Sequence, residues 1–165
     1  MQQSISATLS LTEMFDNLTD TQLELVASIC EPMTLKNQEI VFGENDGSDE
    51  LYVIGRGAVE ILVNPGFVGT KEDSHVPIVI AELRQGQIIG EVALVDQGLR
   101  SATVRVSQDG TYLLRIPRNR LMLLCDTYPE LGYKIMKNLA ADLALKMRNT
   151  DLTVRQYQLM LTRQG

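Results

Sequence analysis

Hydrophobic and polar residues follow two different periods along the chain, and the changes of period divide it into three zones. Over residues 10–32 apolar positions recur at helical spacing, and Thr19 to Gln22 forms a capping box ahead of them. Over residues 33–117 apolar, β-branched runs alternate with turn signals about every ten residues. Over residues 118–162 the helical period returns. The pattern predicts N-terminal helices, then short antiparallel strands in a sandwich or jelly-roll barrel, then C-terminal helices. The clearest predicted strands are 51–54, 59–63, 78–80 and 112–116.

The C-terminal zone carries a heptad seam. A short helix that carries Leu121 to Leu124 is followed by Pro129, and proline favours the first turn of a long helix. The seam residues then recur at alternating spacings of four and three: Met136, Ala140, Leu143, Met147, Thr150, Val154, Tyr157 and Leu161. A helix over 129–161 would span on the order of 50 Å, longer than its own barrel can cover. We therefore expect a homodimer through residues 129–161; the alternative is a break near residue 149 that folds the helix back on itself.

Composition and charge narrow the function classes. The net charge is −6 and no basic stripe is visible, so direct nucleic-acid binding is not expected. The one histidine, His75, rules out a cupin-type metal enzyme and most histidine-based catalysis. Cys30 and Cys125 lie in apolar helical patterns and are expected as reduced core thiols. No apolar run suggests a membrane span or a signal peptide, so a cytoplasmic protein without membrane contact is expected.

Candidate chemistry is concentrated in residues 85–104, which are too polar for a strand and too short for an ordinary helix. Residues 90–94 favour one helical turn whose free amides would point at an anion. Arg100 offers a planar guanidinium suited to two phosphate oxygens, and Glu91 can accept a hydrogen bond from a sugar hydroxyl. These residues suggest a site for a phosphate joined to a ribose. The alternative from the residues alone is a surface loop with a Glu–Arg salt bridge.

This segment resembles the phosphate-binding cassette of cyclic nucleotide-binding domains, whose pattern is Phe-Gly-Glu-apolar-Ala-Leu, a short spacer and Arg-small-Ala. The matching residues are Gly90, Glu91, Ala93, Leu94, Arg100, Ser101 and Ala102. Ile89 and Leu99 keep the apolar character of the family's Phe and Pro. The similarity extends from about residue 11 to 155. Two family glycines appear as Asn37 and Asn45, and asparagine tolerates the left-handed backbone that such turns use.

The resemblance implies an α+β, mainly β fold: an antiparallel eight-stranded jelly-roll barrel flanked by N-terminal helices and a long C-terminal helix, in a single domain over 1–165 with the cassette at 89–102. It implies that Arg100 and Ser101 hold a cyclic phosphate, and that Glu91 with Gly90 holds the ribose 2′-hydroxyl. Val92, Ala93 and Ala102 would lie along the sugar-phosphate. The purine would rest on Ile80 and Leu83, whose alternative role is plain core.

The final helix normally closes the pocket in this family. Thr150 matches a threonine of the cAMP receptor proteins that meets the adenine amino group, and the next residue there, a serine, reaches the neighbouring subunit's pocket. Here that next residue is Asp151, whose carboxylate could accept from adenine or from guanine. Ser101 stands where cGMP sites often carry threonine, which favours cAMP over cGMP. Thr150 could instead be a polar seam residue that fixes the dimer register.

The expected function is a stand-alone cyclic nucleotide receptor, not an enzyme, with cAMP as ligand and no other cofactor or metal. It would signal by rearranging its C-terminal helices toward a downstream protein that the sequence does not identify, or within a dimer. The helix-turn-helix of the family's transcription factors is absent from these residues. The alternatives are a dimerising interaction module whose pocket is vestigial or holds another ligand, and the effector half of a transcription regulator.

Overall fold

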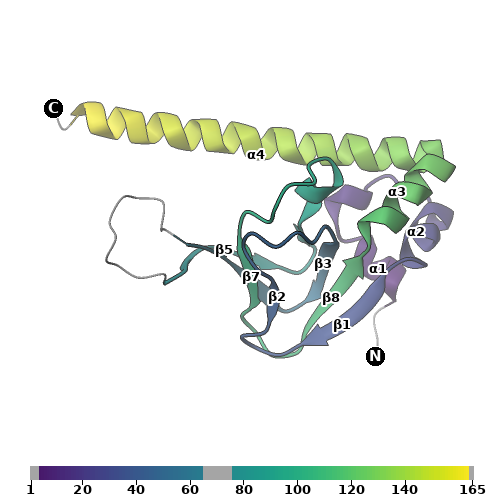
Figure 1. The fold of residues 1–165 in the computed structure, drawn as a ribbon. Coiled ribbons are helices and arrows are strands. Elements are labelled where there is room, and N and C mark those ends of the chain that lie inside the picture. Colours follow the sequence, from purple (N-terminus) through teal and green to yellow (C-terminus); the bar gives the residue numbers. More distant parts are fainter. Residues whose placement is uncertain (1–3, 65–75, 164–165) are drawn as a thin grey trace.

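The computed structural model describes residues 4–64 and 76–163 (Figure 1). Its helical elements are α1 (Ile5–Leu9), η1 (Glu13–Phe15), α2 (Asp20–Ala27), η2 (Glu91–Leu94), α3 (Arg118–Thr127) and α4 (Pro129–Arg163). Its strands are β1 (Glu31–Leu35), β2 (Ile40–Phe42), β3 (Leu51–Arg56), β4 (Ala58–Val63), β5 (Ile78–Arg84), β6 (Ile88–Ile89), β7 (Thr103–Val106) and β8 (Thr111–Ile116). The predicted α+β fold, with a β roll between N-terminal helices and a long C-terminal helix, is confirmed.

The strands of the described ranges form two four-stranded sheets, ordered β1-β8-β3-β6 and β2-β7-β4-β5, with every pairing antiparallel. In β7 the buried and less buried residues alternate, because successive side chains of a strand point to opposite faces. The inward-facing side chains meet between the sheets, where burial of apolar area stabilises the roll. This first core contains Phe42, Tyr52, Ile54, Val59, Ile89, Val104, Val106 and Leu113.

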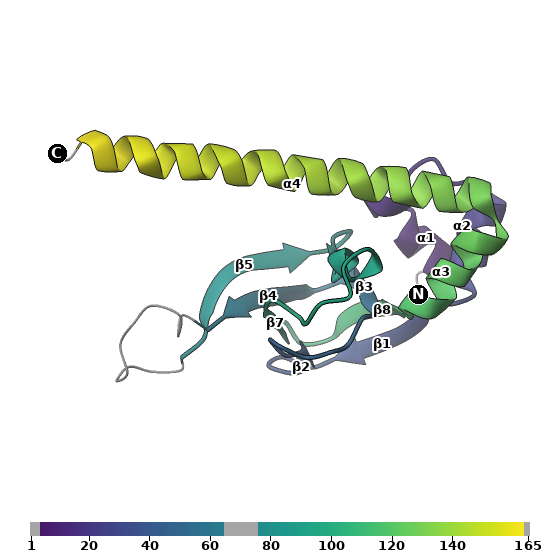
Figure 2. The same cartoon turned by 45° about the horizontal axis from the view of Figure 1, so that its top comes forward.

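A second core joins the helices to one sheet. Its buried members are Leu9, Met14, Phe15, Val26, Leu51, Val53, Leu94, Leu114, Ile116, Leu121, Cys125, Leu131, Ile135 and Leu139. The last three lie four residues apart along α4, so one stripe of its first three turns packs on the body of the protein. Beyond that stripe α4 continues without a break to Arg163, and the predicted alternative of a break near residue 149 is wrong. Figures 1 and 2 show α4 lying over the roll and projecting past it.

Two local expectations need correction. The N-terminal helices span residues 5–27 rather than 10–32, because Glu31 and Pro32 belong to β1 and pair with β8. β1 is an edge strand, where a proline without an amide hydrogen is tolerated. Asn45 has the expected positive φ of 70°, but in the other turn the positive φ of 73° falls on Gln38 and not on Asn37. The backbone N–H of Asn37 instead donates a hydrogen bond to Oδ1 of Asp109 at 2.7 Å.

The cysteines are free, as expected: Cys125 is buried and Cys30 packs against the second core. Burial raises the pKa of the Cys30 thiol to about 12, so it stays protonated. His75 lies outside the described residues. Within the described ranges, no helix combines the length and the apolar character needed to cross a membrane.

Candidate functional site

A cavity of about 610 Å³ lies between the cassette, the roll and α4. The cassette contributes residues 90–93 and 99–102 to its wall. The strands contribute Phe42, Ile61, Leu83 and Val104, the segment around η1 contributes residues 11–14, and α4 contributes Asn138, Leu139, Asp142 and Lys146. The cavity thus has an apolar wall on the roll side and a charged wall where the cassette faces α4.

Glu91 and Arg100 are both buried in the wall of this cavity, each with 7% of its surface exposed. Among the residues that the structure describes, they are the only charged residues buried to this degree. A buried charge is costly unless hydrogen bonds and opposite charges compensate it. The partners of these two side chains therefore indicate what the site can bind.

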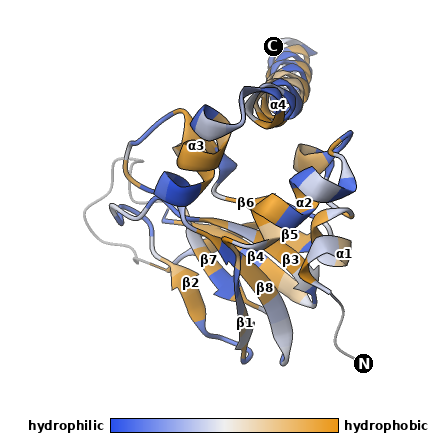
Figure 3. Ribbon diagram, turned by 90° about the vertical axis from the view of Figure 1, so that its right-hand side faces the viewer, coloured by the Kyte–Doolittle hydropathy of each residue, from blue (hydrophilic) through white to orange (hydrophobic). Residues whose placement is uncertain are grey.

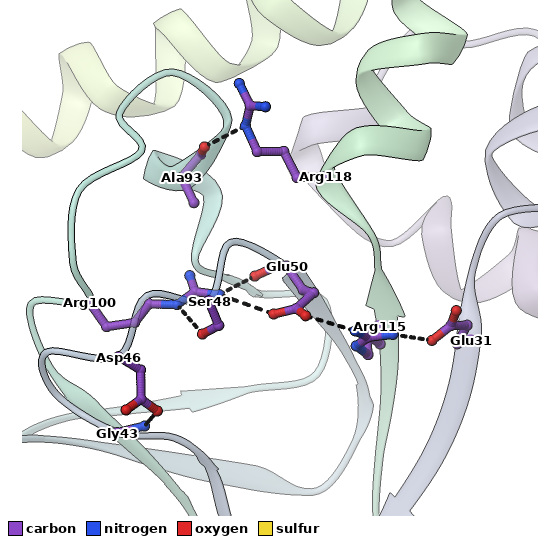
Figure 4. A network of polar contacts seen from close by, with 9 residues as sticks. All are labelled: Glu31, Gly43, Asp46, Ser48, Glu50, Ala93, Arg100, Arg115 and Arg118. Carbon is purple, nitrogen blue, oxygen red and sulfur yellow. Dashed lines mark hydrogen bonds and ion pairs between the residues drawn. The ribbon is translucent and has the colours of Figure 1, made fainter.

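The Arg100 guanidinium is held by the loop that precedes β3 (Figure 4). Its Nε donates to the Ser48 hydroxyl at 3.1 Å, and its Nη2 donates to the Glu50 carbonyl at 2.6 Å. The ring of Phe42 lies 4.0 Å from the guanidinium carbon, in a cation–π contact. Backbone hydrogen bonds from Asn45 to Arg100 and from Arg100 to Asp46 fix the same segment. The side chain is thus oriented largely by neutral groups, which leave its positive charge in place.

Gly90 is the residue that lets Arg100 take this position. Its φ is 78°, a left-handed backbone that favours glycine. A Cβ at this position would lie 2.6 Å from Nη1 of Arg100 and 3.0 Å from the Glu50 carbonyl oxygen. The predicted helical turn after it is confirmed, as the 3-10 turn η2. The carbonyls of Ala93 and Leu94 in this turn accept hydrogen bonds from Arg118 at 2.9 and 3.0 Å, which tie η2 to α3.

Glu91 is paired with α4 and not with Arg100. Lys146 donates a short hydrogen bond to the Glu91 carboxylate and also lies 3.0 Å from Asp142, four residues earlier on the same helix. Burial acts to lower the pKa of Lys146, but its hydrogen bonds to Glu91 and Asp142 outweigh this and raise the pKa. The predicted alternative of a surface loop with a Glu–Arg salt bridge is therefore wrong, since both side chains are buried and have other partners.

A charge network connects Arg100 to the roll. The Glu50 carboxylate lies 3.8 Å from Nη2 of Arg100 and 2.7 Å from Nη2 of Arg115 on β8. Arg115 also pairs closely with Glu31 on β1 (Figure 4). Burial acts to raise the pKa of Glu50, but the hydrogen bond from Arg115 and the charges of Arg115 and Arg100 lower it. Glu50 is thus held as a carboxylate between two guanidinium groups.

The predicted site residues divide into two groups. The cassette residues Gly90, Glu91, Val92, Ala93, Arg100, Ser101 and Ala102, together with Leu83, line the cavity. Ile80 does not; it is 59% exposed on β5 and belongs neither to the cavity wall nor to the core. The pairing of β5 with β4 skips Ile80, because Ile61 pairs with Ala81 and Leu62 with Val79. Ile80 is thus the extra residue of a bulge and has no paired partner on β4.

Thr150 and Asp151 lie on α4 beyond Lys146, outside the wall of the cavity. Both are exposed, and the Thr150 hydroxyl donates to the Lys146 carbonyl at 3.0 Å. A single chain therefore does not bring these residues to the cavity. The sequence did not predict four further residues of the site and its network: Glu50, Arg115, Asp142 and Lys146. Only Asp142 and Lys146 left a signal there, as an acid–base pair four residues apart on a predicted helix.

No cluster of three or more metal-ligating side chains occurs in the described residues. The cavity wall instead suits a ligand with an anionic group and a hydroxyl. The Arg100 guanidinium can bind the anionic group, and the Glu91 carboxylate can accept a hydrogen bond from the hydroxyl.

The comparisons with known proteins agree with this chemistry. The family model of the cyclic nucleotide-binding domain matches residues 32–128, more than half of the chain. The cyclic AMP receptor protein of Thermus thermophilus is 28% identical over 139 residues, covering 84% of this chain and 59% of that protein. The cyclic GMP-binding protein C of Dictyostelium discoideum is 29% identical over 148 residues, covering 87% of this chain and 5% of that protein.

Among solved structures, the catabolite activator protein of Thermus thermophilus superposes with a TM-score of 0.74 at 26% identity. The match covers 89% of this chain and 63% of that one. This chain thus spans less than two thirds of each of the three proteins compared. The family match, the cassette in the cavity wall and the fold together lead to one conclusion: the chain belongs to the cyclic nucleotide-binding domain family.

Proposed function

We propose that this chain is a receptor for a cyclic mononucleotide, with cAMP preferred over cGMP, and that it has no catalytic activity of its own. The observation that carries the proposal is that the two buried charges of the described chain, Glu91 and Arg100, line one cavity. A cyclic nucleotide offers both a phosphate for the guanidinium and a 2′-hydroxyl for the carboxylate. Such a ligand would add an anionic partner for Arg100 and a hydroxyl donor for Glu91, beside the partners that each side chain already has.

In this proposal the phosphate binds Arg100 and Ser101, and the ribose 2′-hydroxyl donates to Glu91 beside Gly90. Val92, Ala93 and Ala102 line the wall along the sugar-phosphate, as expected from their place in the cassette. The base extends toward the apolar wall that Phe42, Ile61 and Leu83 provide, where its faces can be covered. Leu83 thus keeps its proposed role, whereas Ile80 does not.

The link from the ligand to α4 is the pair of Glu91 and Lys146. A hydroxyl that hydrogen bonds to the Glu91 carboxylate changes the environment of the Lys146 ammonium, and Lys146 is part of α4. Binding therefore favours the α4 position that suits the new contact, which is a population shift between helix positions. If nucleotide left hydrogen exchange along residues 135–161 unchanged, this coupling would be wrong.

The second copy is part of the proposal because α4 is exposed beyond residue 146. Among its exposed apolar side chains, Met147, Val154, Tyr157 and Leu161 fall on the heptad seam. A homodimer along this seam would place Thr150 or Asp151 at the partner's base, where a hydroxyl or carboxylate accepts from the adenine amino group. The free thiols of Cys30 and Cys125 suit a reducing, cytosolic setting.

The test is isothermal titration of the full chain with cAMP, cGMP and 5′-AMP, repeated on Arg100→Ala. Binding of a cyclic nucleotide that disappears in the variant supports the receptor and identifies the base. Binding that survives in Arg100→Ala would show that the anion site lies elsewhere. No binding by the wild type would leave the dimerising interaction module, which the exposed seam of α4 favours, as the better function.

A further inference from the structure

We propose that Arg115 is a positioning residue for the anion site: it holds the Glu50 carboxylate away from Arg100 and so leaves the Arg100 charge to a bound phosphate. The inference rests on the proposed function, because it concerns the same site. It adds a residue that lies on β8, outside the cassette and outside the cavity wall. Arg115 acts through Glu50 and need not touch the ligand.

The geometry gives Glu50 two possible guanidinium partners and shows which one it takes. Glu50 lies just before β3, and Arg115 lies on the neighbouring strand β8, opposite Tyr52. Glu50 Oε1 accepts a hydrogen bond from Arg115 at 2.7 Å, whereas Oε2 is 3.8 Å from Arg100, beyond hydrogen-bonding distance. Arg115 is itself anchored on its other side by Glu31 of β1. The carboxylate is therefore drawn toward the strands (Figure 4).

The chemistry explains why this matters for an anion. A carboxylate and a phosphate use the same N–H groups of a guanidinium, so a carboxylate paired directly with Arg100 would compete with a phosphate. Nη2 and Nε of Arg100 are satisfied by a carbonyl and a hydroxyl, which do not cancel its charge. Nη1 of Arg100 donates no hydrogen bond to any residue in the described ranges. It lies next to Gly90, on the side where any other residue would carry its Cβ. That nitrogen is available to a ligand.

Loss of Arg115 has a consequence that a merely structural residue would not have. Without its nearer partner, the Glu50 carboxylate would turn to Arg100 and compete with the ligand. Removing that carboxylate as well should then restore binding. If Arg115 only supported the sheet, Glu50 would not move to Arg100 in its absence, so removing the Glu50 carboxylate would not restore the lost affinity.

The experiment titrates cAMP into the wild type, R115Q, E50Q and the double variant R115Q/E50Q of the full chain. We expect roughly tenfold weaker binding by R115Q and a return to within about threefold of wild type in the double variant. The matched control is R105Q. Arg105 makes a 2.8 Å cross-strand pair with Glu60 at a similar exposure, 29% against 32% for Arg115, and is outside the cavity wall. R105Q should bind cAMP as the wild type does.

A second measurement keeps the inference separate from the proposed function. The ¹⁵N resonance of Arg100 Nε is recorded without nucleotide; it should shift in R115Q and return in the double variant. If R115Q does not fold, R115K takes its place, since an ammonium cannot bind both carboxylates through a planar fork. Wild-type affinity in R115Q, or a double variant no better than R115Q, would overturn the inference. If the wild type binds no cyclic nucleotide, the proposed function fails. The Arg100 resonance then decides by itself whether Arg115 holds the Glu50 carboxylate away from Arg100.

Discussion

At the scale of single residues, the site depends on how closely the backbone approaches the buried Arg100 guanidinium. Gly90 adopts a positive φ and leaves room for Nη1 of Arg100, and both requirements exclude a side chain. The same residue begins the turn that carries Glu91. One glycine therefore sets the relative positions of the two buried charges.

Gly90→Ala tests this dependence. The new Cβ would lie 2.6 Å from Arg100 Nη1 and 3.0 Å from a backbone oxygen that cannot easily move. We expect the guanidinium to be displaced and cyclic nucleotide binding to weaken by roughly tenfold or more. Titration calorimetry measures the affinity, and urea unfolding measures the stability.

Gly110→Ala is the matched control for Gly90→Ala. Gly110 has a similar φ of 71°, but a Cβ there would meet nothing within 4 Å. It should lose about 1 kcal/mol of stability to backbone strain and keep wild-type affinity. Equal effects of the two substitutions on binding would refute the steric explanation.

The lowered pKa of Glu50 predicts how stability responds to acid. Burial acts to raise this pKa, but the hydrogen bond and charge of Arg115 and the charge of Arg100 outweigh burial and lower the pKa below the ordinary 4.5. Tyr52 lies nearby, and burial together with the Glu50 charge raises the pKa of its hydroxyl. Because the folded state then binds fewer protons than the unfolded state, the stabilisation is present above pH 4.5 and is lost as pH falls through the lowered pKa. Glu50→Gln removes this pH-dependent stabilisation.

The measurement is urea unfolding from about pH 6 to about pH 3. The wild type should lose more unfolding free energy over this range than Glu50→Gln does. Glu130→Gln, which removes an 80% exposed carboxylate on α4, serves as a control for the change in net charge. Parallel profiles for the wild type and Glu50→Gln would show that the Arg115–Glu50 pair adds no pH-dependent stability.

At the scale of elements, the ion pair of Lys146 and Glu91 joins α4 to η2, and its two side chains differ in their exposure to solvent. The Glu91 side chain is 9% exposed, whereas that of Lys146 is 53% exposed. Removing Lys146 therefore leaves a buried carboxylate without its cation. Lys146→Gln should cost about 1 to 3 kcal/mol of unfolding free energy, because an uncompensated buried polar group costs far more than a lost surface pair.

Lys134→Gln is the comparison on the same helix. Its ion pair with Glu130 spans 3.9 Å to a side chain that is 80% exposed, and its Nζ also donates to Gln22 Oε1 at 2.9 Å. Neither partner is buried, so the expected loss is about 1 kcal/mol or less. Urea unfolding of both variants gives the difference, and an equally small loss in Lys146→Gln would mean that water already solvates Glu91.

The elements also explain what the sequence could and could not predict. Glu91 and Arg100 were found because they lie in one short motif whose spacing is visible in the chain. Lys146 was missed because its place above Glu91 depends on how Leu131, Ile135 and Leu139 seat α4 on the second core. A contact between residues so far apart in the chain leaves no local pattern in the sequence.

Strand register limits prediction in a similar way. Arg115 meets Glu50 and Glu31 only because β8 lies between β1 and β3 in a particular register. Ile80, which the resemblance placed at the purine, lies outside the cavity wall at a bulge in β5, and a bulge leaves no clear signature in the continuous apolar run of residues 78–81. The fold was predictable from period and motif, whereas the charge network was not.

At the scale of the whole molecule, α4 is larger than the surface that its own chain offers it. It is 35 residues long, and its buried residues end at Leu139. Figures 1 and 2 show the remainder extending past the roll, and in Figure 3 the helix, viewed along its axis, carries both hydrophobic and hydrophilic residues. Exposed apolar residues on a projecting helix favour association with another helix.

The predicted heptad seam indicates which face of α4 would associate in a dimer. Val154 lies on the seam and is 49% exposed, whereas Leu152 lies on the opposite face of α4 and is 58% exposed. Val154→Glu would place like charges against each other across a two-fold seam, so the dimer should weaken by at least about tenfold. Leu152→Glu adds the same charge to the same helix away from the seam, and its dimer should persist.

Sedimentation velocity over a range of concentrations, with and without cAMP, measures both effects. If the partner's Thr150 or Asp151 completes the base site, Val154→Glu should also weaken nucleotide binding, since a single chain leaves these residues outside the cavity. A monomeric wild type would refute the predicted dimer along the seam. Dissociation by both substitutions would mean that the helix associates through more than one face, and a dissociated Val154→Glu that binds cAMP normally would place the whole site within one chain.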